Sequence, residues 1–327
     1  MKKFFGKVLS AIYRFGLDVC QGSYKIFPFR IRKVNARVIS VGNITWGGTG
    51  KTPLVIKLAH DLAYYGKRVV VLTRGYSTDE VEELRARLGS IPVIVGRDRV
   101  KSAEEAVKKH NAEYILLDDG FQHLRLHRDL DVVAINTTLP FGPGGLIPAG
   151  TLREPVEYLS RGDIFVLTKS NLGSKNLHWI RQRLGALKPN PIIFEAFHRP
   201  SRLWDPVANR TVSLDELRGK RISTLSGIAD PYSFEKTAEL LGSHIAFAAR
   251  FDDHHAYSVN EISEFARRSK ESGVNYIVTT QKDYYRLGPV LKRKDVFAAC
   301  GFSLRVLQIE FKIADDEENF IRRCLNS

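Results

Sequence analysis

A loop of small residues that ends in Lys-Thr carries the clearest chemistry in this sequence. It follows an apolar run, and its sequence is Gly42-Asn-Ile-Thr-Trp-Gly-Gly-Thr-Gly-Lys-Thr-Pro53. Closely spaced glycines let backbone N–H groups approach phosphate oxygens, while a lysine and a hydroxyl can meet the outer phosphates and a magnesium ion. Thr45 replaces the first glycine of the usual pattern, but Gly47 and Gly48 keep the loop small. The spacing predicts a P-loop that binds a nucleotide with Mg²⁺.

We expect phosphate oxygens to bind the small and polar groups of this loop. The predicted nucleotide-binding residues in it are Asn43, Gly47, Gly48, Thr49, Gly50, Lys51 and Thr52. Lys51 is also a predicted catalytic residue, because its ammonium group can neutralise charge on a phosphate that is being transferred. The alternative is a glycine-rich turn without a ligand. The order of apolar run, loop, Lys-Thr and helical pattern favours the nucleotide site.

A pair of carboxylates follows another apolar run, Tyr114–Leu117. The pair is Asp118 and Asp119. Ligands bind α/β sheets at the carboxyl ends of parallel strands, and carboxylate oxygens suit Mg²⁺. We therefore predict that Asp118, Asp119 and Thr52 hold the magnesium ion. Aspartates at strand ends also serve as helix caps, and the Lys-Thr pair of the loop is what favours the metal.

Four further polar residues lie in predicted loops after strands. Gln122 and His123 follow the acid pair, and Arg153 and Glu154 follow Pro148-Ala-Gly150. We predict that the first two contact the substrate and the last two the nucleotide, since the planar guanidinium of arginine suits a phosphate. Hydrogen bonding between domains is the alternative for either pair.

The elements that position these residues alternate between β-branched runs and helical patterns. The candidate strands of the first part are Arg37–Val41, Arg68–Thr73, Ile91–Val95, Tyr114–Leu117, Leu130–Ile135 and Asp163–Thr168. Such alternation predicts a doubly wound parallel sheet with helices on both faces, the α/β architecture of P-loop NTPases. Gly66 after the helical pattern Thr52–Tyr65 supports this, and Ser102 with Glu105 indicates a capping box.

The alternation is interrupted once. After Pro191–Ala196, the segment His198–Asp205 fits neither pattern. A second set of strands and helices follows, at Arg221–Leu225, Tyr232–Gly242, His244–Ala249, Val259–Gly273 and Tyr276–Thr280. We therefore predict two domains, residues 1–198 with the P-loop and residues 199–327 as a smaller α/β domain.

The N-terminal 43 residues differ from the rest in charge. They contain nine basic residues and one acid, Asp18. The apolar residues that recur there at helical spacing are Phe4, Phe5, Val8, Leu9, Ile12 and Phe15. This pattern predicts a basic amphipathic helix, which lies on an anionic membrane surface or packs on its own domain. An apolar stripe serves either purpose, so both interpretations stand.

Composition limits the partners. The chain has 327 residues, and its 50 basic residues exceed its 36 acidic ones to give a formal charge of +14, which favours an anionic partner. Nucleic acid is the least favoured of these, because no nucleic-acid-reading motif accompanies the basic cluster. Cys20, Cys300 and Cys324 are too far apart to predict a disulfide framework or a cysteine zinc site. Without a long apolar run or a secretory signal pattern, we expect a protein that is neither transmembrane nor secreted.

In the order of its motifs the chain resembles the tetraacyldisaccharide 4'-kinase family, which phosphorylates the lipid A precursor at the inner membrane of Gram-negative bacteria. The resembling stretches are Val41–Thr45 with Gly47–Pro53, Arg74–Tyr76, Val95–Val100, Asp118–His123, Leu146–Gly150 with Leu152–Pro155, Gly227–Pro231, Phe251–His254 and Thr280–Asp283. The resemblance implies a P-loop kinase domain and a smaller α/β domain with the active site in the cleft between them. It also implies an N-terminal helix on the cytoplasmic face of the inner membrane, ATP and Mg²⁺, and lipid A disaccharide 1-phosphate as the acceptor.

The resemblance further implies a catalytic base and a histidine partner. The family's Gly-Asp-Glu-Pro segment corresponds to Thr78-Asp-Glu-Val81, which makes Asp79 the base, and the histidine of its Phe-x-Asp-His motif falls on His254. The chain departs from the family here, because the segment before Asp79 is shorter and the flanking Gly and Pro are missing. The alternative for Asp79 is an acidic first turn favoured by a helix dipole. His255 is a second candidate for the histidine.

Two functions agree with these residues. The first is an ATP-dependent kinase that transfers the γ-phosphate to the 4'-hydroxyl of the tetraacyldisaccharide 1-phosphate precursor of lipid A. Phosphoryl transfer needs positioning and charge more than covalent chemistry, so a P-loop lysine, Arg153 and the magnesium-binding acids suit it. The alternative is a membrane-associated P-loop ATPase switch without a lipid acceptor. A kinase phosphorylates a glycolipid, whereas a switch only hydrolyses ATP.

Overall fold

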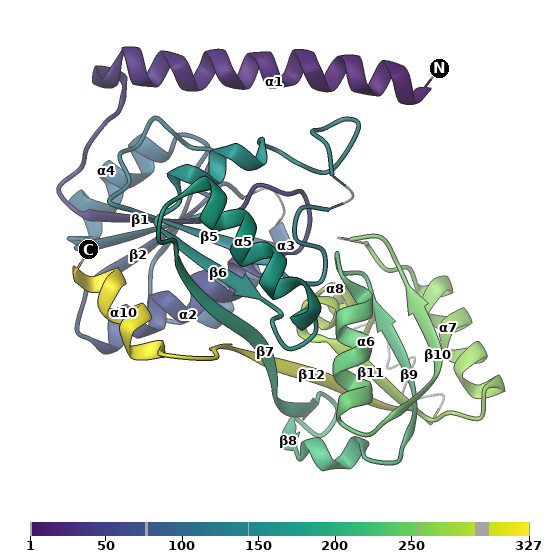
Figure 1. Cartoon of the computed structure of the whole chain (residues 1–327). Coiled ribbons are helices and arrows are strands. Elements are labelled where there is room, and N and C mark those ends of the chain that lie inside the picture. The colour runs from purple at the N-terminus through teal and green to yellow at the C-terminus, as the bar shows by residue number, and fades with distance from the viewer. Residues whose placement is uncertain (1, 76–77, 143, 254, 292–300, 327) are drawn as a thin grey trace. The chain divides into compact units, whose positions relative to one another are not determined.

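The computed structural model describes residues 2–75, 78–142, 144–253, 255–291 and 301–326, of which 2–4, 78–80 and 289–291 are described as backbone only. The chain divides into two compact units. The first unit is Met1–Phe197 with Phe311–Ser327, and the second unit is His198–Glu310. The chain passes between them along two strands, β7 (Ile192–Asp205) and β12 (Ser303–Ile313) (Figure 1).

The C-terminal segment groups differently from what the sequence indicates. We expected residues 199–327 to form one domain, whereas residues 311–327 cluster with the first unit. The cause is α10 (Glu317–Asn326), which buries Phe320 completely and places its ring 5.3 Å from that of Phe194. A short amphipathic helix near the chain end does not reveal in sequence which unit it covers.

The first unit is built on a parallel sheet with the strand order β7-β6-β5-β1-β4-β2-β3. The bounds of its other strands are β1 Arg37–Gly42, β2 Val69–Thr73, β3 Val93–Val95, β4 Tyr114–Asp118, β5 Leu130–Asn136 and β6 Ile164–Thr168. The chain leaves β1 toward β2 and β3, returns beside β1 as β4, and continues on the other side with β5. β1 and its neighbours therefore mark the switch point of the sheet, where α/β proteins bind ligands. The predicted doubly wound parallel sheet is confirmed.

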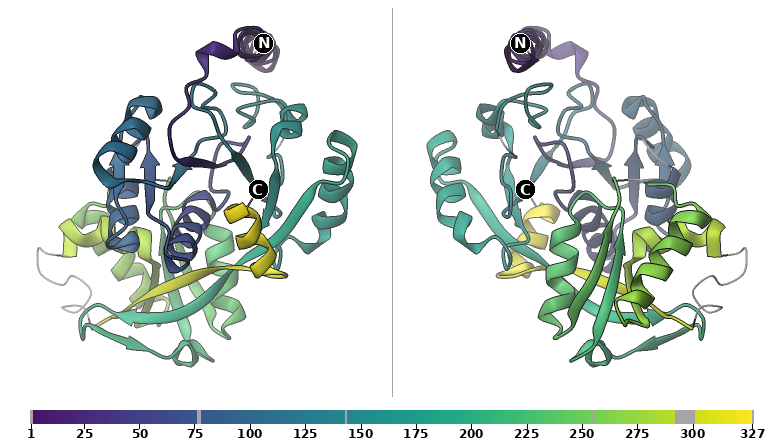
Figure 2. Two further views of the ribbon diagram at one scale, coloured as in Figure 1. Left: turned by 90° about the vertical axis from the view of Figure 1, so that its left-hand side faces the viewer. Right: turned by 90° about the vertical axis from the view of Figure 1, so that its right-hand side faces the viewer.

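Helices cover both faces of this sheet (Figure 2). One face carries α2 (Lys51–Tyr64), α3 (Thr78–Leu88) and α10, and the other carries α4 (Arg99–His110) and α5 (Leu177–Leu187). Successive residues of β5 point alternately into the two cores, Val132 toward α2 and Val133 toward α5. Strands that are buried on both faces explain the nearly continuous apolar runs in the sequence.

One predicted helix start was wrong. Ser102 and Glu105 do not form a capping box, because α4 already begins at Arg99. The Asp98 carboxylate caps it and accepts hydrogen bonds from two first-turn N–H groups at 3.1 and 3.3 Å. The chain also forms short 3₁₀ helices, which are η1 Pro28–Arg30, η2 Val156–Arg161, η3 Ser174–Asn176 and η4 Leu214–Leu217.

The second unit is a smaller α/β body. Its parallel strands follow the order β10-β9-β11-β12, and β8 (Arg210–Val212) pairs with β7 in the antiparallel sense. The bounds of its remaining elements are β9 Arg221–Ser226, α6 Pro231–Leu240, β10 His244–Arg250, α7 Val259–Glu271, β11 Tyr276–Thr280 and α8 Gln281–Leu291. α6 covers one face, and α7 and α8 cover the other. The segment His198–Asp205, which fits neither pattern in the sequence, is the second half of the 14-residue strand β7, and the second unit begins at His198.

α1 (Lys2–Ile26) belongs to the first unit and has two different faces. Half-buried residues recur along one face, and they are Gly6, Ser10, Tyr13, Leu17 and Gln21. The predicted apolar stripe lies on the roughly opposite face, since a helix has 3.6 residues per turn, and its Phe5 and Phe15 are 66% and 70% exposed. Packing and the exposed stripe therefore belong to separate sets of residues. None of the described helices combines the length and the apolar character needed to cross a membrane.

Candidate functional site

The glycine-rich loop lies between β1 and α2, at the switch point of the sheet. Gly42 ends β1 where a Cβ atom would lie 2.5 Å from the Cβ of Phe121, so this close approach requires glycine. Gly50 has a φ of 81° and is the N-cap of α2, which begins at Lys51. The N-terminus of α2 therefore opens at the loop, and its N–H groups and dipole favour an anion there.

Buried side chains fix the shape of the loop. Asn43 is fully buried, and its Nδ2 donates hydrogen bonds to the Thr45 carbonyl at 2.8 Å and the Thr49 Oγ1 at 2.9 Å. From the end of β6, the Thr168 hydroxyl donates to the Thr49 carbonyl at 2.9 Å. Sequence analysis did not identify Thr168, whose only signal is its position as the last residue of a predicted strand. The loop is thus held in shape by polar groups beneath it.

The Asp119 carboxylate lies between two cations. The Lys51 Nζ is 3.7 Å from its Oδ1, and the Arg153 Nη1 donates to both carboxylate oxygens at 2.7 and 2.9 Å. Burial alone would raise the pKa of Asp119, but Lys51 and Arg153 outweigh it and hold the pKa below its usual value. Asp119 is therefore ionised at neutral pH. The structure brings together three residues that the sequence placed in three different segments.

Asp118 is the last residue of β4, immediately before Asp119, and it is buried. Its Oδ2 accepts a hydrogen bond of 3.5 Å from the Thr73 hydroxyl, and its carbonyl accepts one of 3.2 Å from the Arg99 Nη2. Arg99 is 3% exposed and adds positive charge near the acid pair. Neither Thr73 nor Arg99 was a predicted site residue. Arg99 lies in one of the segments that carry the family resemblance, and Thr73 ends a predicted strand.

Residues 151–154 run alongside the start of the P-loop. The Trp46 N–H donates to the Thr151 carbonyl at 2.7 Å, and the Arg153 N–H donates to the Ile44 carbonyl at 2.8 Å. These backbone bonds explain how Arg153 reaches Asp119 from a distant part of the sequence. We call residues 144–158 the clamp segment, because it holds the loop from one side.

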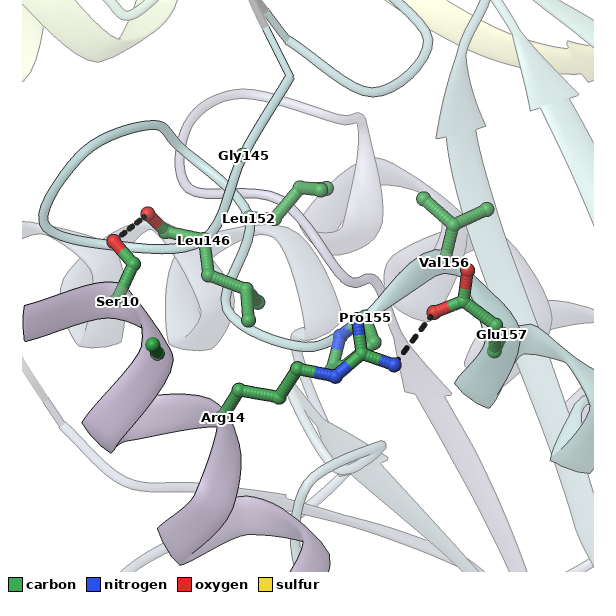
Figure 3. A pocket seen from close by; sticks show the side chains of 9 residues that line it. Ser10, Arg14, Gly145, Leu146, Leu152, Pro155, Val156 and Glu157 are labelled. Carbon is green, nitrogen blue, oxygen red and sulfur yellow. Dashed lines mark hydrogen bonds and ion pairs between the residues drawn. The ribbon is translucent and has the colours of Figure 1, made fainter. Parts of the chain in front are cut away.

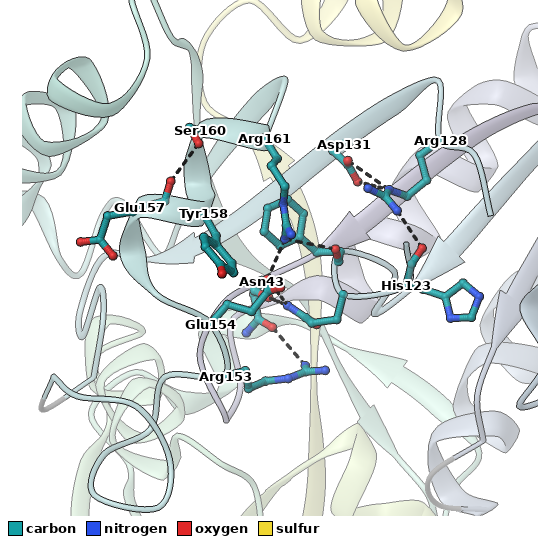
Figure 4. A network of polar contacts seen from close by, with 12 residues as sticks. Asn43, His123, Arg128, Asp131, Arg153, Glu154, Glu157, Tyr158, Ser160 and Arg161 are labelled. Carbon is teal, nitrogen blue, oxygen red and sulfur yellow. Dashed lines mark hydrogen bonds and ion pairs between the residues drawn. The ribbon is translucent and has the colours of Figure 1, made fainter. Parts of the chain in front are cut away.

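A network of polar contacts links Glu154 and Arg161 to Asn43 at the start of the loop (Figure 4). Gln122 Nε2 donates to the Asn43 carbonyl at 2.7 Å and to the Glu154 carboxylate at 3.0 Å. Glu154 is 3% exposed and also accepts from the Arg161 Nη2 at 2.8 Å. Burial raises the pKa of Glu154, and Arg161 opposes that effect. The partners of Glu154 in this network are protein groups, and its contact with a nucleotide stays a prediction.

His123 is held in a positively charged environment. Its carbonyl accepts a hydrogen bond of 2.7 Å from the Arg128 Nη1. Burial lowers the pKa of His123 to about 4, and the nearby charges of Arg99 and Arg128 add to the effect. The imidazole is therefore neutral at physiological pH.

The candidate magnesium ligands are all oxygen donors. Asp118 is the last residue of β4, Asp119 follows it, and Thr52 lies in the first turn of α2, which begins at the loop. Hard oxygen ligands with a carboxylate near a phosphate site match the preferences of Mg²⁺. Among the described residues no group of three or more His, Cys, Asp and Glu side chains gathers as a metal site. Two carboxylates and one hydroxyl suit Mg²⁺, which usually keeps several water ligands.

Known proteins of one family are similar to this chain over most of its length. Residues 3–85 and 77–326 match the family model of the tetraacyldisaccharide-1-P 4'-kinase, LpxK. The chain is 34% identical over 346 aligned positions to the tetraacyldisaccharide 4'-kinase of Halothermothrix orenii strain H 168, with 95% of this chain and 89% of the relative covered. The chain belongs to this family. A 4'-kinase from Syntrophus aciditrophicus strain SB is 35% identical over 331 positions, with 92% and 88% covered.

A solved family structure also matches over almost the whole length. It is LpxK from Aquifex aeolicus in complex with ATP, with a TM-score of 0.71, 26% sequence identity and 99% of each chain covered. The resemblance that the motifs indicate is thereby confirmed. The two stretches that match the family model overlap at residues 77–85, the segment in which the chain departs from the family pattern around Asp79.

The residues that the family resemblance assigns to base catalysis are only partly described. Asp79 lies in the first turn of α3 as backbone, and its side chain is not described; His254 lies outside the described residues. The neighbouring His255 has partners of its own, since its Nε2 lies 3.1 Å from the Glu261 Oε1 and its ring stacks on Phe251 at 4.6 Å. His255 is thus engaged within the second unit.

The low pKa of His123 predicts a pH-dependent contribution to stability. The unfolded chain takes up the proton near pH 6.5, whereas the folded chain resists it down to about 4. The contribution of neutral His123 to the free energy of unfolding is therefore complete above pH 6.5 and is lost as the pH falls toward 4. Between pH 7.5 and 5 the free energy of unfolding should fall by about 1 kcal/mol more in the wild type than in His123→Asn, allowing for the partial exposure of the ring.

Urea unfolding followed by circular dichroism at both pH values measures this difference. His178→Asn, which replaces an exposed histidine in α5 of the same unit, is the control and should behave as the wild type. Equal pH dependence of His123→Asn and wild type would contradict the assignment.

Proposed function

We propose that this chain is a kinase that transfers the γ-phosphate of ATP to the 4'-hydroxyl of a tetraacyldisaccharide 1-phosphate. The observation that carries the proposal is the convergence of Lys51 and Arg153 on Asp119 at the P-loop, at 3.7 and 2.7 Å. Membership of the 4'-kinase family and the structural likeness to a relative crystallised with ATP support both the reaction and the nucleotide.

The loop and its two cations would bind the phosphates. Backbone N–H groups of Gly47 to Thr52, at the N-terminus of α2, would donate hydrogen bonds to the phosphate oxygens, as in other P-loops. Lys51 and Arg153 already lie side by side because Asp119 neutralises them. A phosphate offers them a second anionic partner, so they can stabilise charge on the transferred group without a large rearrangement.

Thr52, Asp118 and Asp119 would hold Mg²⁺, since they are hard oxygen donors next to the phosphate-binding loop. The ion supplies charge neutralisation and orientation of the outer phosphates when it is bound. Asp119 is suited to this role because its pKa is lowered and its carboxylate is ionised at neutral pH. Arg153 binds the same carboxylate and keeps it oriented toward the loop.

Asp79 would accept the proton of the attacking hydroxyl, and His254 would orient it, as the family resemblance implies. The engagement of His255 with Glu261 and Phe251 supports His254 as the histidine in question. Gln122 and His123 are the proposed acceptor contacts. Within the described part of the chain, the Gln122 Oε1 and the His123 Nε2 are buried atoms without a hydrogen-bond partner. The Gln122 oxygen can accept a hydrogen bond from a ligand, and the His123 nitrogen can accept or donate one according to its tautomer.

α1 would seat the enzyme on the cytoplasmic face of the inner membrane. Its exposed stripe includes Phe5, Ile12 and Phe15, which are 66%, 63% and 70% exposed, and lysines and arginines flank it. Apolar side chains next to basic ones favour the surface of an anionic bilayer. The acceptor is a glycolipid of such a bilayer, so this position brings the enzyme to its substrate.

The direct test is a reaction of the purified protein with ATP, Mg²⁺ and lipid A disaccharide 1-phosphate, analysed by mass spectrometry. The proposal requires the addition of one phosphate to the lipid. ATP hydrolysis without lipid phosphorylation would favour the ATPase switch instead.

Lys51→Ala should lower lipid phosphorylation by about 10²- to 10³-fold, because the lysine charge acts on the transferred group. The melting temperature should stay near that of the wild type, since Asp119 keeps Arg153 as its partner. Lys108→Ala, which removes an exposed lysine from α4, is the matched control and should retain full activity. A folded Lys51→Ala enzyme with normal turnover would place the nucleotide elsewhere.

Asp79→Ala and His254→Ala should each slow the chemical step by about 10²- to 10⁴-fold, with the double variant little worse than either single one. ATP binding should survive, because neither residue belongs to the P-loop. The measurement is a single-turnover double-mutant cycle at saturating ATP. Glu82→Ala, an exposed acid on the same helix as Asp79, is the control. Effects that multiply would mean that the two residues act independently.

Replacing Ile12 and Phe15 by serine should release the protein from anionic vesicles, because these side chains belong to the exposed stripe. Activity on a detergent-dispersed acceptor should change much less than activity on vesicles. Vesicle co-sedimentation and the two assays measure both effects. Thr211→Ser, an exposed position on β8, serves as a control. Full vesicle binding by the double serine variant would contradict the proposed membrane role of the stripe.

A further inference from the structure

The clamp segment lies between α1 and the P-loop. On the α1 side, the Ser10 hydroxyl donates to the Leu146 carbonyl at 2.8 Å (Figure 3). The same hydroxyl accepts from the Ala149 N–H at 3.1 Å. The Arg14 guanidinium lies 3.6 Å from the Glu157 carboxylate, along a cavity of about 310 Å³ between the helix and the segment. These contacts attach α1 along the length of the clamp segment.

Tyr13 of α1 contacts a residue that is itself bonded to the P-loop. The Tyr13 hydroxyl donates to the Arg153 carbonyl at 2.8 Å. The N–H of the same residue donates to Ile44 in the P-loop, and its side chain holds Asp119. Arg153 is therefore bonded on one side to α1 and on the other side to the P-loop.

Two other polar contacts of α1 are made to residues outside the P-loop. Ser10 bonds to the backbone of Leu146 and Ala149, and the Arg14 to Glu157 pair is half exposed, with 52% of each side chain accessible. Exposed ion pairs of this kind fix geometry weakly. Tyr13 is half-buried and packs against the same apolar core as Leu17, so its ring has a fixed position from which the hydroxyl can act.

We infer that Tyr13 is a positioning residue for the nucleotide site, and that it orients the Arg153 guanidinium toward the phosphates by holding the Arg153 backbone. The inference rests on the proposed role of Arg153 as a phosphate-binding residue. Burial raises the pKa of Tyr13, with Glu154 adding to it and Arg153 opposing it, so the hydroxyl stays protonated and able to donate.

The contact with Arg153 and the exposed apolar stripe use different faces of α1. Tyr13 lies on the half-buried face, while Phe5 and Phe15 lie on the roughly opposite, exposed face. A lipid surface can therefore bind the stripe without competing with Tyr13 for space. The same helix that is proposed to meet the membrane then sets the position of a phosphate-binding arginine.

The test is the affinity for the β,γ-imido analogue of ATP with Mg²⁺, measured by calorimetry on the full chain. Tyr13→Phe removes only the hydroxyl and should raise the dissociation constant about 3- to 10-fold, the loss expected for one hydrogen bond. Tyr24→Phe, which removes a hydroxyl from the same helix and keeps the ring against Arg30, should leave it unchanged. Melting temperatures of both variants should stay within the spread of replicate wild-type measurements.

A double-mutant cycle with Arg153→Ala separates positioning from simple packing. Arg153→Ala keeps the carbonyl that Tyr13 binds but has no guanidinium to position. In that background Tyr13→Phe should have no further effect on the dissociation constant. The same factor in both backgrounds, or no effect of Tyr13→Phe on the wild type, would overturn the inference.

Failure of the proposed function gives a different result. If Arg153→Ala binds the analogue as tightly as the wild type does, Arg153 is not a phosphate-binding residue, and the inference about Tyr13 is wrong as well. If the lipid is not phosphorylated while the binding cycle behaves as described, the kinase proposal is wrong but the role of Tyr13 stands.

Discussion

A single carboxylate between two cations is the interaction on which the proposed nucleotide site depends. Lys51 and Arg153 would repel each other if Asp119 did not lie between them. Three features of the fold bring these groups together. β4 lies beside β1, α2 begins at the lysine, and the clamp segment pairs with the P-loop. The sheet, the helix start and the clamp are therefore all needed for the charges to meet, and a phosphate arriving at the loop finds them already assembled.

The parts of this site that sequence could predict are those with local chemistry. Lys51 and Thr52 stand in a recognisable loop, and Asp118 and Asp119 end an apolar run, so both groups are visible within a few residues. In a parallel sheet the carboxyl ends of neighbouring strands lie at the same edge. Because β1 and β4 are neighbours, the loop and the acid pair meet there. The alternating pattern of runs also predicted the doubly wound sheet, because strands buried on both faces must be apolar throughout.

The parts that sequence could not predict depend on contacts between distant residues. The hydrogen bond of Thr168 to the P-loop joins positions 119 residues apart, and the buried pair of Glu154 and Arg161 has no signature that separates it from a surface pair. The docking face of α1 was missed for a different reason. It mixes Gly6 and Ser10 with larger residues, so it forms no apolar pattern, and the exposed stripe dominates the helical signal.

The return of the chain through β12 has a consequence for biosynthesis. A ribosome makes the whole of the second unit before it makes α10, yet Phe320 of that helix is fully buried beside Phe194 in the first unit. Domains usually fold as they emerge, from the N-terminus onward. Here the earlier-made unit still lacks one helix of its core when synthesis of the second unit is complete. Until α10 is made, the apolar surface that includes Phe194 lacks its cover.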